Sequence, residues 1–466
     1  MDAENNHQVP WGQRISYAMS DFGCNTIFQI VGTYFLVFAT DTMGIAAAAV
    51  TGLFAISAII DSFDGLIWGQ FIDRTQTRWG KSRPYWLWFS IPFGIFCVMA
   101  FTNVPFGQTG KIIWIYIAYI GAKVLYSGIN IPVTSILPTL SSSPSEKITL
   151  STVRQLFGNF GAAIFLPLTL PAVILFAGIF DKGAKDPSTS SVGWFIWAVI
   201  LAVITVAALL IAFSGTRERV VTRDSQRAVP MRESIKALKG NYPWAIIIFI
   251  NFIYWGGFAV RASALPYYFK YNLHNEGLGS LVLAGTIITV LSTALIPFCS
   301  KWIGKRNTML LGMTGTAVSQ LILYLADRMG DSIPVILIGI VLYYISYGLT
   351  GALIAVMLSD AVDFGEWKNG VRAEGFVTSF SSFSAKLGMG LGSMILAAVL
   401  AAGHYIAGSA AQSSASLNAI TLGFIWIPFI GYAASAVALL FNNVDKLEPQ
   451  MLKDLKAKHT AELEAE

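Results

Sequence analysis

Apolar stretches long enough to cross a lipid bilayer recur along the whole of this 466-residue chain. An α-helix needs about 20 predominantly apolar residues to cross the hydrocarbon core, and a window of that length finds about twelve stretches. They are expected at 15–40, 44–72, 84–104, 112–138, 149–178, 193–214, 243–269, 277–300, 307–327, 333–359, 376–403 and 417–441. The sequence therefore predicts an all-α polytopic membrane protein.

Charged residues are too scarce for a soluble protein of this size. Asp, Glu, Lys and Arg make up 12% of the chain and hydrophobic residues 55%, whereas soluble domains carry roughly 25% charged residues. The high apolar content also excludes an intrinsically disordered chain. The net charge of +5 is accompanied by no nucleic-acid motif and no basic arm, so we expect a lipid bilayer around the protein and no nucleic acid partner.

Positive charge is concentrated in the loops after the even-numbered stretches and in the tail. Such loops face the cytoplasm, which predicts two cytoplasmic termini and a location in the cell membrane. The basic residues of these segments are Arg74, Arg78, Lys81, Arg83, Arg217, Arg219, Arg223, Arg227, Arg232, Lys236, Lys239, Lys301, Lys305, Arg306, Lys368, Arg372, Lys446, Lys453, Lys456 and Lys458. The opposite loops carry little beyond Lys111, Lys182, Lys185, Lys270 and Arg328.

The two halves of the chain repeat one another. Arg154 in the fifth stretch and Lys386 in the eleventh are separated by nearly the distance between the starts of the first and seventh stretches. We expect six-helix bundles over 1–214 and 242–441, a basic cytoplasmic linker over 215–241 and a cytoplasmic tail over 442–466. Two such halves are typical of secondary transporters, which bind substrate near the midplane between the halves.

Ionisable residues inside membrane spans are costly and are functional candidates by default. Asp61 and Asp64 lie deep in the second stretch at i and i+3, on one helix face. Two close carboxylates cannot both ionise freely, so the pair is suited to bind a proton, or Na⁺ if neighbouring oxygens complete the shell. Alternatively, each pairs with a membrane cation such as Lys386 or Arg154 and holds the bundle together.

Polar residues at helical spacing in three stretches predict a polar cavity the size of a sugar. Hydroxyl groups of a sugar need both donors and acceptors, whereas the alternative interpretation is hydrogen bonding that joins helices. The residues are Asp21 and Asn25, then Tyr126, Asn130 and Thr134, and finally Ser382 and Lys386. Lys123 could line the cavity or pair with Asp21, and Arg261 could snorkel to the interface.

The cationic loop Arg74–Tyr85 and the corresponding loop of the second half, Lys301–Arg306, are both expected on the cytoplasmic side. Acidic residues at the ends of predicted spans are expected close to them. Charge pairs there would close the cytoplasmic side of the bundle, unless the basic residues only set the orientation. The candidate gating residues are Arg74, Arg78, Lys81, Asp360, Asp363 and Glu366.

Three sequence motifs of the chain resemble those of a known family. The runs DRTQTRWGKSRPY, NIP and DAVDFGEWKNGVRAEG, in that order, are similar to those of the glycoside–pentoside–hexuronide:cation symporters, which have the major facilitator fold. The segments PWGQRISYAMSDFGCN and FDGLIWG look closest to the xyloside (isoprimeverose) symporters of that family. The resemblance implies cation-coupled uptake of a glycoside by a protein that is not an enzyme.

The resemblance also implies roles for individual residues. Asp61 stands where melibiose-type members bind the cation, but Gly65 replaces their second Asp, and Asp64 lies one position earlier. This change favours H⁺ over Na⁺ as the coupling ion. Asn25, Asn130 and Thr134 replace acidic and Trp sugar contacts, which argues against a galactoside. The family's sugar and linking positions are Tyr126, Arg154, Ser382 and Lys386.

Several alternatives remain open at the level of sequence. They are a Na⁺-coupled symporter, a sugar exchanger, a lysolipid transporter and a transport-inactive sensor. A membrane enzyme is disfavoured because the chain has only 4 His and no HExxH motif. We expect no cofactor and a functional monomer, and the tail over 442–466 is too short for the phosphotransferase domain fused to some family members.

Overall fold

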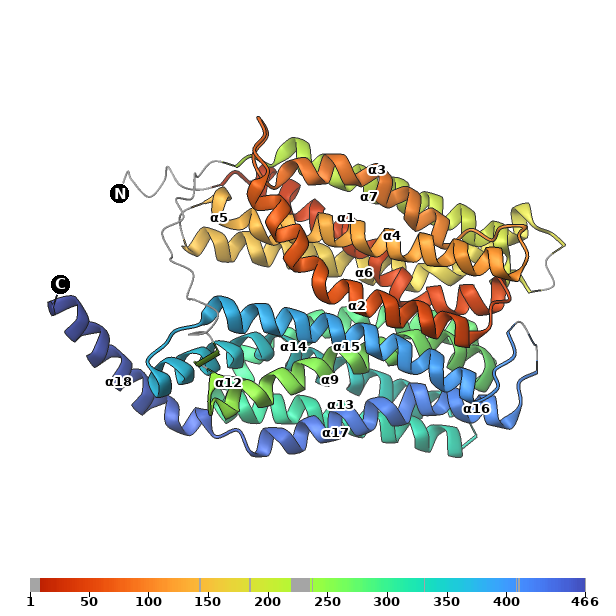
Figure 1. Cartoon of the computed structure of the whole chain (residues 1–466). Helices are drawn as coiled ribbons and strands as arrows, with labels where there is room; N and C mark the ends of the chain where they lie inside the picture. The colour runs from red at the N-terminus through yellow and green to blue at the C-terminus, as the bar shows by residue number, and fades with distance from the viewer. Residues whose placement is uncertain are drawn as a thin grey trace. The chain divides into compact units, whose positions relative to one another are not determined.

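The computed structural model describes residues 9–141, 144–183, 186–218, 235–236, 238–330, 332–407, 409 and 411–465. Over these residues the protein is helical (Figure 1), with one isolated bridge between Thr77 and Gly80 and no β-strand. The predicted all-α class is confirmed.

The described residues of the first half of the chain form seven α-helices. The first continues through a π-helical turn, η2, and a 3-10 turn, η3, precedes the last. The elements are α1 (Trp11–Val37), η2 (Phe38–Thr42), α2 (Ala47–Arg74), α3 (Arg83–Ala100), α4 (Gln108–Ser135), α5 (Leu137–Leu140), α6 (Pro144–Phe180), η3 (Pro187–Thr189) and α7 (Ser191–Gly215).

The second half begins in the same way, with a long helix that continues through a π-helical turn. Its elements are α9 (Tyr242–Tyr267), η4 (Tyr268–Asn272), α10 (Glu276–Ala284), α11 (Thr286–Thr293), α12 (Ile296–Ile303), α13 (Lys305–Arg328), α14 (Ile333–Asn369), α15 (Glu374–Ala402), α16 (Ser414–Thr421), η5 (Leu422–Trp426), α17 (Ile427–Leu440) and α18 (Val444–Ala465).

Ten helical segments of the described residues are long and apolar enough to cross a membrane. The two remaining predicted stretches, 44–72 and 84–104, coincide with α2 and α3. The predicted span 277–300 overlaps the segment Glu276–Thr293, which is one of these ten, and the helix is divided here into α10, α11 and α12. Gly285 lies at the first break, and Pro297 is the second residue of α12. Proline lacks the N–H that a continuous helix would use.

The described residues form two compact units that do not follow the chain's midpoint. The first consists of Met1–Ser225, Ala262–Ala284 and Ser393–Thr421, and the second of Gln226–Arg261, Gly285–Gly392 and Leu422–Glu466. The expected bundles at 1–214 and 242–441 and the tail at 442–466 stay predictions, and most of the linker at 215–241 lies outside the described residues.

Small residues bring helices of the first unit into close contact where the polar side chains lie. A Cβ atom added at Gly158 of α6 would lie 2.9 Å from Asp21 Oδ2, and one added at Gly161 would overlap Thr26 Oγ1. On the other side of α1, Thr205 of α7 donates a hydrogen bond to the Gly23 carbonyl. Helix α1 is therefore held against α6 and α7 by close backbone approach, as in membrane helix pairs rich in small residues.

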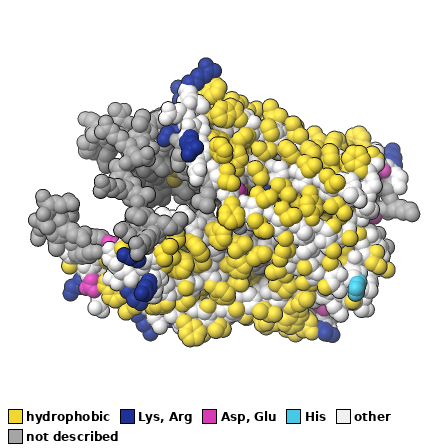
Figure 2. All heavy atoms as spheres, viewed as in Figure 1, with side chains coloured by type: hydrophobic (Ala, Val, Ile, Leu, Met, Phe, Trp, Pro, Cys, Tyr) yellow, Lys and Arg dark blue, Asp and Glu magenta, His cyan; other side chains and the backbone are white. Residues whose placement is uncertain are grey.

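In the second unit, the C-terminal helix α18 packs on the end of α14. Phe364 of α14 joins Val444, Met451 and Leu455 of α18 in an apolar cluster. Elsewhere hydrophobic side chains dominate the face shown in Figure 2, and few charged side chains interrupt them. An exposed surface of this kind is suited to contact with lipid.

Candidate functional site

Polar side chains from α1, α4 and α6 meet inside the first unit. Asn25 Nδ2 donates to Asp21 Oδ1 at 2.8 Å, and Tyr126 Oη donates to Asn25 Oδ1 at 3.3 Å. An Arg154 guanidinium nitrogen lies 3.9 Å from Asp21 Oδ2. We call these four residues the central polar cluster. Asp21 is only 6% exposed, so its charge is compensated by neighbours rather than by bulk water.

Arg154 retains hydrogen-bonding capacity within this cluster. Its distance of 3.9 Å from Asp21 is longer than a hydrogen bond. Its Nε is buried and has no hydrogen-bond partner among the residues that the structure describes. A buried donor without a partner is costly. The arrangement can therefore accept a ligand that supplies oxygen acceptors.

Two further predicted residues follow Tyr126 along α4 at the helical spacing. Asn130 is half-buried, and its Nδ2 lies 3.7 Å from Cys24 Sγ on α1. Thr134 is exposed, and its hydroxyl donates to the Ile131 carbonyl of its own helix at 2.9 Å. Asn130 therefore extends the polar line toward α1, whereas the Thr134 hydroxyl is used within its own helix.

Asp61 and Asp64 are buried because α2 presents its other face outward. The exposed residues Ile56, Ile59 and Phe63 recur along α2 at steps of three or four, while Asp61 and Asp64 are 8% and 4% exposed. An amphipathic helix in lipid turns its apolar stripe to the bilayer and its carboxylates inward.

Lys123 of α4 pairs with Asp61, and not with Asp21 as one interpretation of the sequence allowed. Its Nζ lies 3.2 Å from Asp61 Oδ2, and both side chains are largely buried. The ammonium also lies 4.6 Å from the centre of the Phe28 ring. Arg154, considered from sequence as a partner of Asp61, lies beside Asp21 instead. The partner of Asp61 and the ring of Phe28 were both missed from sequence.

The predicted residues of α15 belong to the second unit. Ser382 is exposed, and its hydroxyl donates to the Thr378 carbonyl at 3.2 Å. Lys386 lies one turn further and is half-buried. Their placement beside the residues of the first unit stays a prediction.

The acidic candidate gating residues have basic partners. Arg372 donates hydrogen bonds to Asp363 at 2.7 Å and to Glu366 at 2.9 Å. These hydrogen bonds, that to Glu366 above all, hold the pKa of Arg372 above its usual value. Lys305 lies 2.7 Å from Asp360.

The basic candidate gating residues lie in the first unit. Arg74, Arg78 and Lys81 are all exposed. The guanidinium of Arg78 covers the ring of Trp79 at 4.6 Å. Glu218 accepts a hydrogen bond from the backbone N–H of Lys81 at 3.2 Å.

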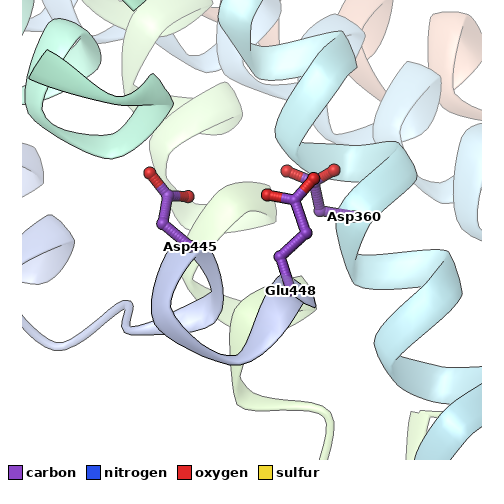
Figure 3. A group of neighbouring side chains, drawn as sticks. All are labelled: Asp360, Asp445 and Glu448. Carbon is purple, nitrogen blue, oxygen red and sulfur yellow. The ribbon is translucent and has the colours of Figure 1, made fainter. Parts of the chain in front are cut away.

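Asp360 also belongs to a group of three carboxylates, drawn in Figure 3. It comes from α14, and Asp445 and Glu448 come from α18. Lys305 Nζ lies 2.9 Å from Glu448 as well as beside Asp360, and the backbone N–H of Arg306 donates to Asp445 at 2.9 Å. Lys305 thus compensates part of the negative charge, and its contacts with Asp360 and Glu448 join α18 to α14.

A second polar group, which sequence reasoning missed, lies around the buried Asp41 at the end of α1. Tyr271 and Tyr405 both donate hydrogen bonds to the carboxylate of Asp41. Lys270 Nζ lies 3.9 Å from the same carboxylate, 2.8 Å from Asp186 and 3.5 Å from Glu276. We call Asp41, Asp186, Lys270 and Glu276 the Lys270 cluster. A cavity of about 30 Å³ adjoins it.

The loop carboxylate of the Lys270 cluster is held in its ionised form. Burial alone would raise the pKa of Asp186, but the hydrogen bonds from Lys270 and Ser188 outweigh this effect and place the pKa below its usual value. A repeat signal could have found this cluster, because Asp41 and Lys270 lie in the corresponding turns η2 and η4 of the two halves.

Arg261 does not snorkel to the interface, which corrects one of the two interpretations from sequence. It is 3% exposed, and its guanidinium lies 3.6 Å from the ring centre of Tyr343 and 4.9 Å from that of Phe424. Burial against these rings keeps the charge inside the second unit.

Comparison with known proteins gives a consistent result. A model of the family described as MFS/sugar transport protein matches residues 16–446. The chain is 51% identical over 459 residues to the isoprimeverose transporter of Lactiplantibacillus pentosus, covering 98% of this chain and 94% of that protein. It is 28% identical over 457 residues to a putative glycoside/cation symporter of Escherichia coli (strain K12), covering 97% and 96%.

Solved structures share the fold. The crystal structure of a D-xylose–proton symporter matches with a TM-score of 0.64 at 14% sequence identity, covering 92% of this chain and 96% of that one.

Proposed function

The chain belongs to the family of MFS/sugar transport proteins, and from this premise we propose that it is a symporter that uses H⁺ to drive uptake of a xyloside-type glycoside. The observation that carries the proposal is the central polar cluster, which lies in the same unit as the buried Asp61–Lys123 pair. A sugar site and a coupling site on α1, α2, α4 and α6 are the minimum that symport requires.

The central polar cluster has the chemistry to bind sugar hydroxyls. Asp21 accepts hydrogen bonds, Arg154 donates them, and Asn25 and Tyr126 do both. The guanidinium supplies a planar fork of donors that matches a pair of neighbouring hydroxyls. Asn130, Thr134, Ser382 and Lys386 complete the sugar site in this proposal.

The class of sugar rests on the comparison with known proteins. The relative at 51% identity is named as an isoprimeverose transporter, which supports a xylosyl-glucose disaccharide as the first substrate to test. Neutral Asn25 and Asn130 suit an uncharged glycoside, because they offer both donors and acceptors without adding charge.

The Asp61–Lys123 pair favours H⁺ over Na⁺ as the coupling ion. Na⁺ needs several oxygen ligands, and here an ammonium already lies 3.2 Å from the carboxylate. A proton needs only one carboxylate oxygen. Asp64, Ser382 and Lys386 belong to the coupling site in this proposal. Sugar and proton must each raise the other's affinity, because coupling between two sites is reciprocal.

We further propose that the protein lies in the cell membrane as a monomer with both termini in the cytoplasm. The support is the basic character of the loops after even-numbered stretches. Charge pairs of the candidate gating residues would close the cytoplasmic side in this arrangement.

Uptake into proteoliposomes tests the proposed function. Radiolabelled isoprimeverose, a galactoside and a glucuronide are compared under an imposed proton gradient, under a sodium gradient, and with no gradient. We expect isoprimeverose to accumulate with the proton gradient, to leak out when a protonophore is added, and to ignore Na⁺ at constant ionic strength.

Other results would identify the alternatives. Sodium-driven uptake at fixed pH would replace H⁺ by Na⁺ as the coupling ion. Exchange without accumulation would indicate a sugar exchanger, and sugar binding without any flux would indicate a sensor.

A further inference from the structure

We infer that the Lys123 ammonium is a cation tethered at the coupling carboxylate Asp61, and that Phe28 is the positioning residue that links this ion pair to Tyr126 of the central polar cluster. The inference rests on the proposed function and deepens it, because it names the residues that join the cation site to the sugar site.

The ion pair is buried between α2 and α4. The side chains of Lys123 and Asp61 are 15% and 10% exposed. Charges removed from water are stable only in contact with opposite charge, so loss of either charge leaves the other costly. Protonation of Asp61 therefore releases the ammonium from its partner.

The released ammonium has defined neighbours. Asp64 lies one turn from Asp61 on the same buried face of α2, and the ring of Tyr119, on the same helix as Lys123, has its centre 5.8 Å from the ammonium. The Phe28 ring of α1 lies 4.6 Å away, within the range of a cation–π contact. Beyond Phe28, Tyr126 is connected through Asn25 to Asp21 of α1, and Asp21 in turn lies 3.9 Å from Arg154 of α6. The buried thiol of Cys24, which lies 3.7 Å from Asn130 Nδ2, is a further titratable group of α1 beside the central polar cluster.

Phe28 contacts both Lys123 and Tyr126. Its ring stacks on the ring of Tyr126, with 4.0 Å between the ring centres and 14° between the planes. Tyr126 in turn donates to Asn25 in the central polar cluster. Asn25 and Phe28 are i and i+3 on α1, and Lys123 and Tyr126 are i and i+3 on α4, so each pair shares a helix face.

The contacts thus form one path from the carboxylate to the cluster. When the ammonium leaves protonated Asp61, its position over Phe28 changes and the stacked ring of Tyr126 moves with it. The Tyr126 hydroxyl then takes the direction in which it binds sugar. A proton on Asp61 and a sugar at the cluster consequently favour the same state of Lys123, which is what reciprocal coupling requires.

The test measures the affinity for isoprimeverose as a function of pH, by equilibrium binding to the purified full chain without any gradient. Lys123→Met removes the ammonium that links protonation of Asp61 to the Phe28 ring, so this variant should lose at least half of the pH-dependent change in affinity. Lys123→Arg keeps a cation and should keep the profile. Phe28→Leu should still bind sugar but lose at least half of the pH-dependent change, whereas Phe28→Tyr should retain it.

Two further variants show whether a changed profile results from misfolding or from a non-specific loss of packing. The double variant Asp61→Asn with Lys123→Met removes both charges, so it should bind and exchange sugar better than either single variant, with a flat pH profile. Phe22→Leu is the matched control, because Phe22 is another partly buried aromatic of α1 whose ring meets Phe165 instead. It should leave the profile unchanged.

The outcomes separate the inference from the proposed function. If sugar binding by the wild-type protein does not depend on pH but increases with Na⁺, both the proposed proton coupling and this inference are wrong. A pH-linked wild type whose profile is unchanged in Lys123→Met and in Phe28→Leu would overturn this inference alone and leave proton-coupled symport standing.

Discussion

Asp41 and Lys270 lie 3.9 Å apart, each in a π-helical turn that extends the first long helix of its half of the chain. Both belong to the first unit. The repeated halves therefore contribute one charge each to this ion pair, and the hydroxyls of Tyr271 and Tyr405 donate to the two oxygens of Asp41. In the proposed orientation this cluster lies on the side away from the cytoplasm.

Lys270→Met should loosen that end of the protein. The variant leaves Asp41, Asp186 and Glu276 without their common cation. Loss of a charged hydrogen bond costs about 1.5–3 kcal/mol, which corresponds to roughly a 10- to 100-fold larger open population. The measurement is the rate at which an impermeant maleimide labels Ser280→Cys, a residue that lines the adjoining cavity.

The labelling experiment has an internal control. It uses a Cys299→Ser background, because Cys24 and Cys97 are buried and Cys299 is partly accessible. Lys182→Met removes an exposed lysine near the same end and should leave the rate unchanged. An equal rate in Lys270→Met and in the control would show that the cluster does not hold this end closed.

The sequence could predict contacts within one helix but not contacts between helices. Contacts within one helix, such as Asp21 with Asn25, follow from the helical period, and so does the common buried face of Asp61 and Asp64. The partner of Lys123 depends on which faces of α2 and α4 meet, which no single helix encodes. Burial of Arg261 among aromatic rings likewise depends on the packing of α9 against α14. Helix pairing therefore had to come from the structure.

Arg154→Lys should weaken sugar binding while keeping the charge beside Asp21. Lysine cannot present two parallel donors, and weakening two charge-assisted hydrogen bonds of about 1.5–3 kcal/mol each should lower the affinity roughly 10-fold or more. Equilibrium binding of isoprimeverose measures the effect. Arg14→Lys is the matched control, because Arg14 is another buried arginine whose partner is Glu146 at 2.8 Å. Unchanged affinity in Arg154→Lys would assign Arg154 a structural role.

Asp61→Asn should abolish accumulation driven by a proton gradient and retain part of the sugar exchange. An amide cannot carry the transported proton, but the sugar-binding residues of the central polar cluster remain. Paired measurements of gradient-driven uptake and of exchange at equal pH distinguish the two effects. Asp327→Asn, at the end of α13, should preserve both. Normal accumulation by Asp61→Asn would show that a carboxylate other than Asp61 carries the coupled proton.

Arg372→Gln should shift the protein toward the state that is open to the cytoplasm, but only modestly. Arg372 joins Asp363 and Glu366 at the end of α14, and its side chain is 45% exposed. Solvent screens such a contact, so its loss should cost about 1 kcal/mol or less. That is roughly a five-fold change in population at most, and added salt should reduce it further.

Because hydrogen bonds to Glu366 and Asp363 keep the pKa of Arg372 above its usual value, the charge persists at neutral and alkaline pH, and raising the pH should not mimic the variant. Maleimide labelling of Ser382→Cys, in the same Cys299→Ser background, measures the shift. Lys453→Gln removes an exposed charge of α18 and should have no effect, whereas equal labelling of both variants would remove Arg372 and its acidic partners from the gate.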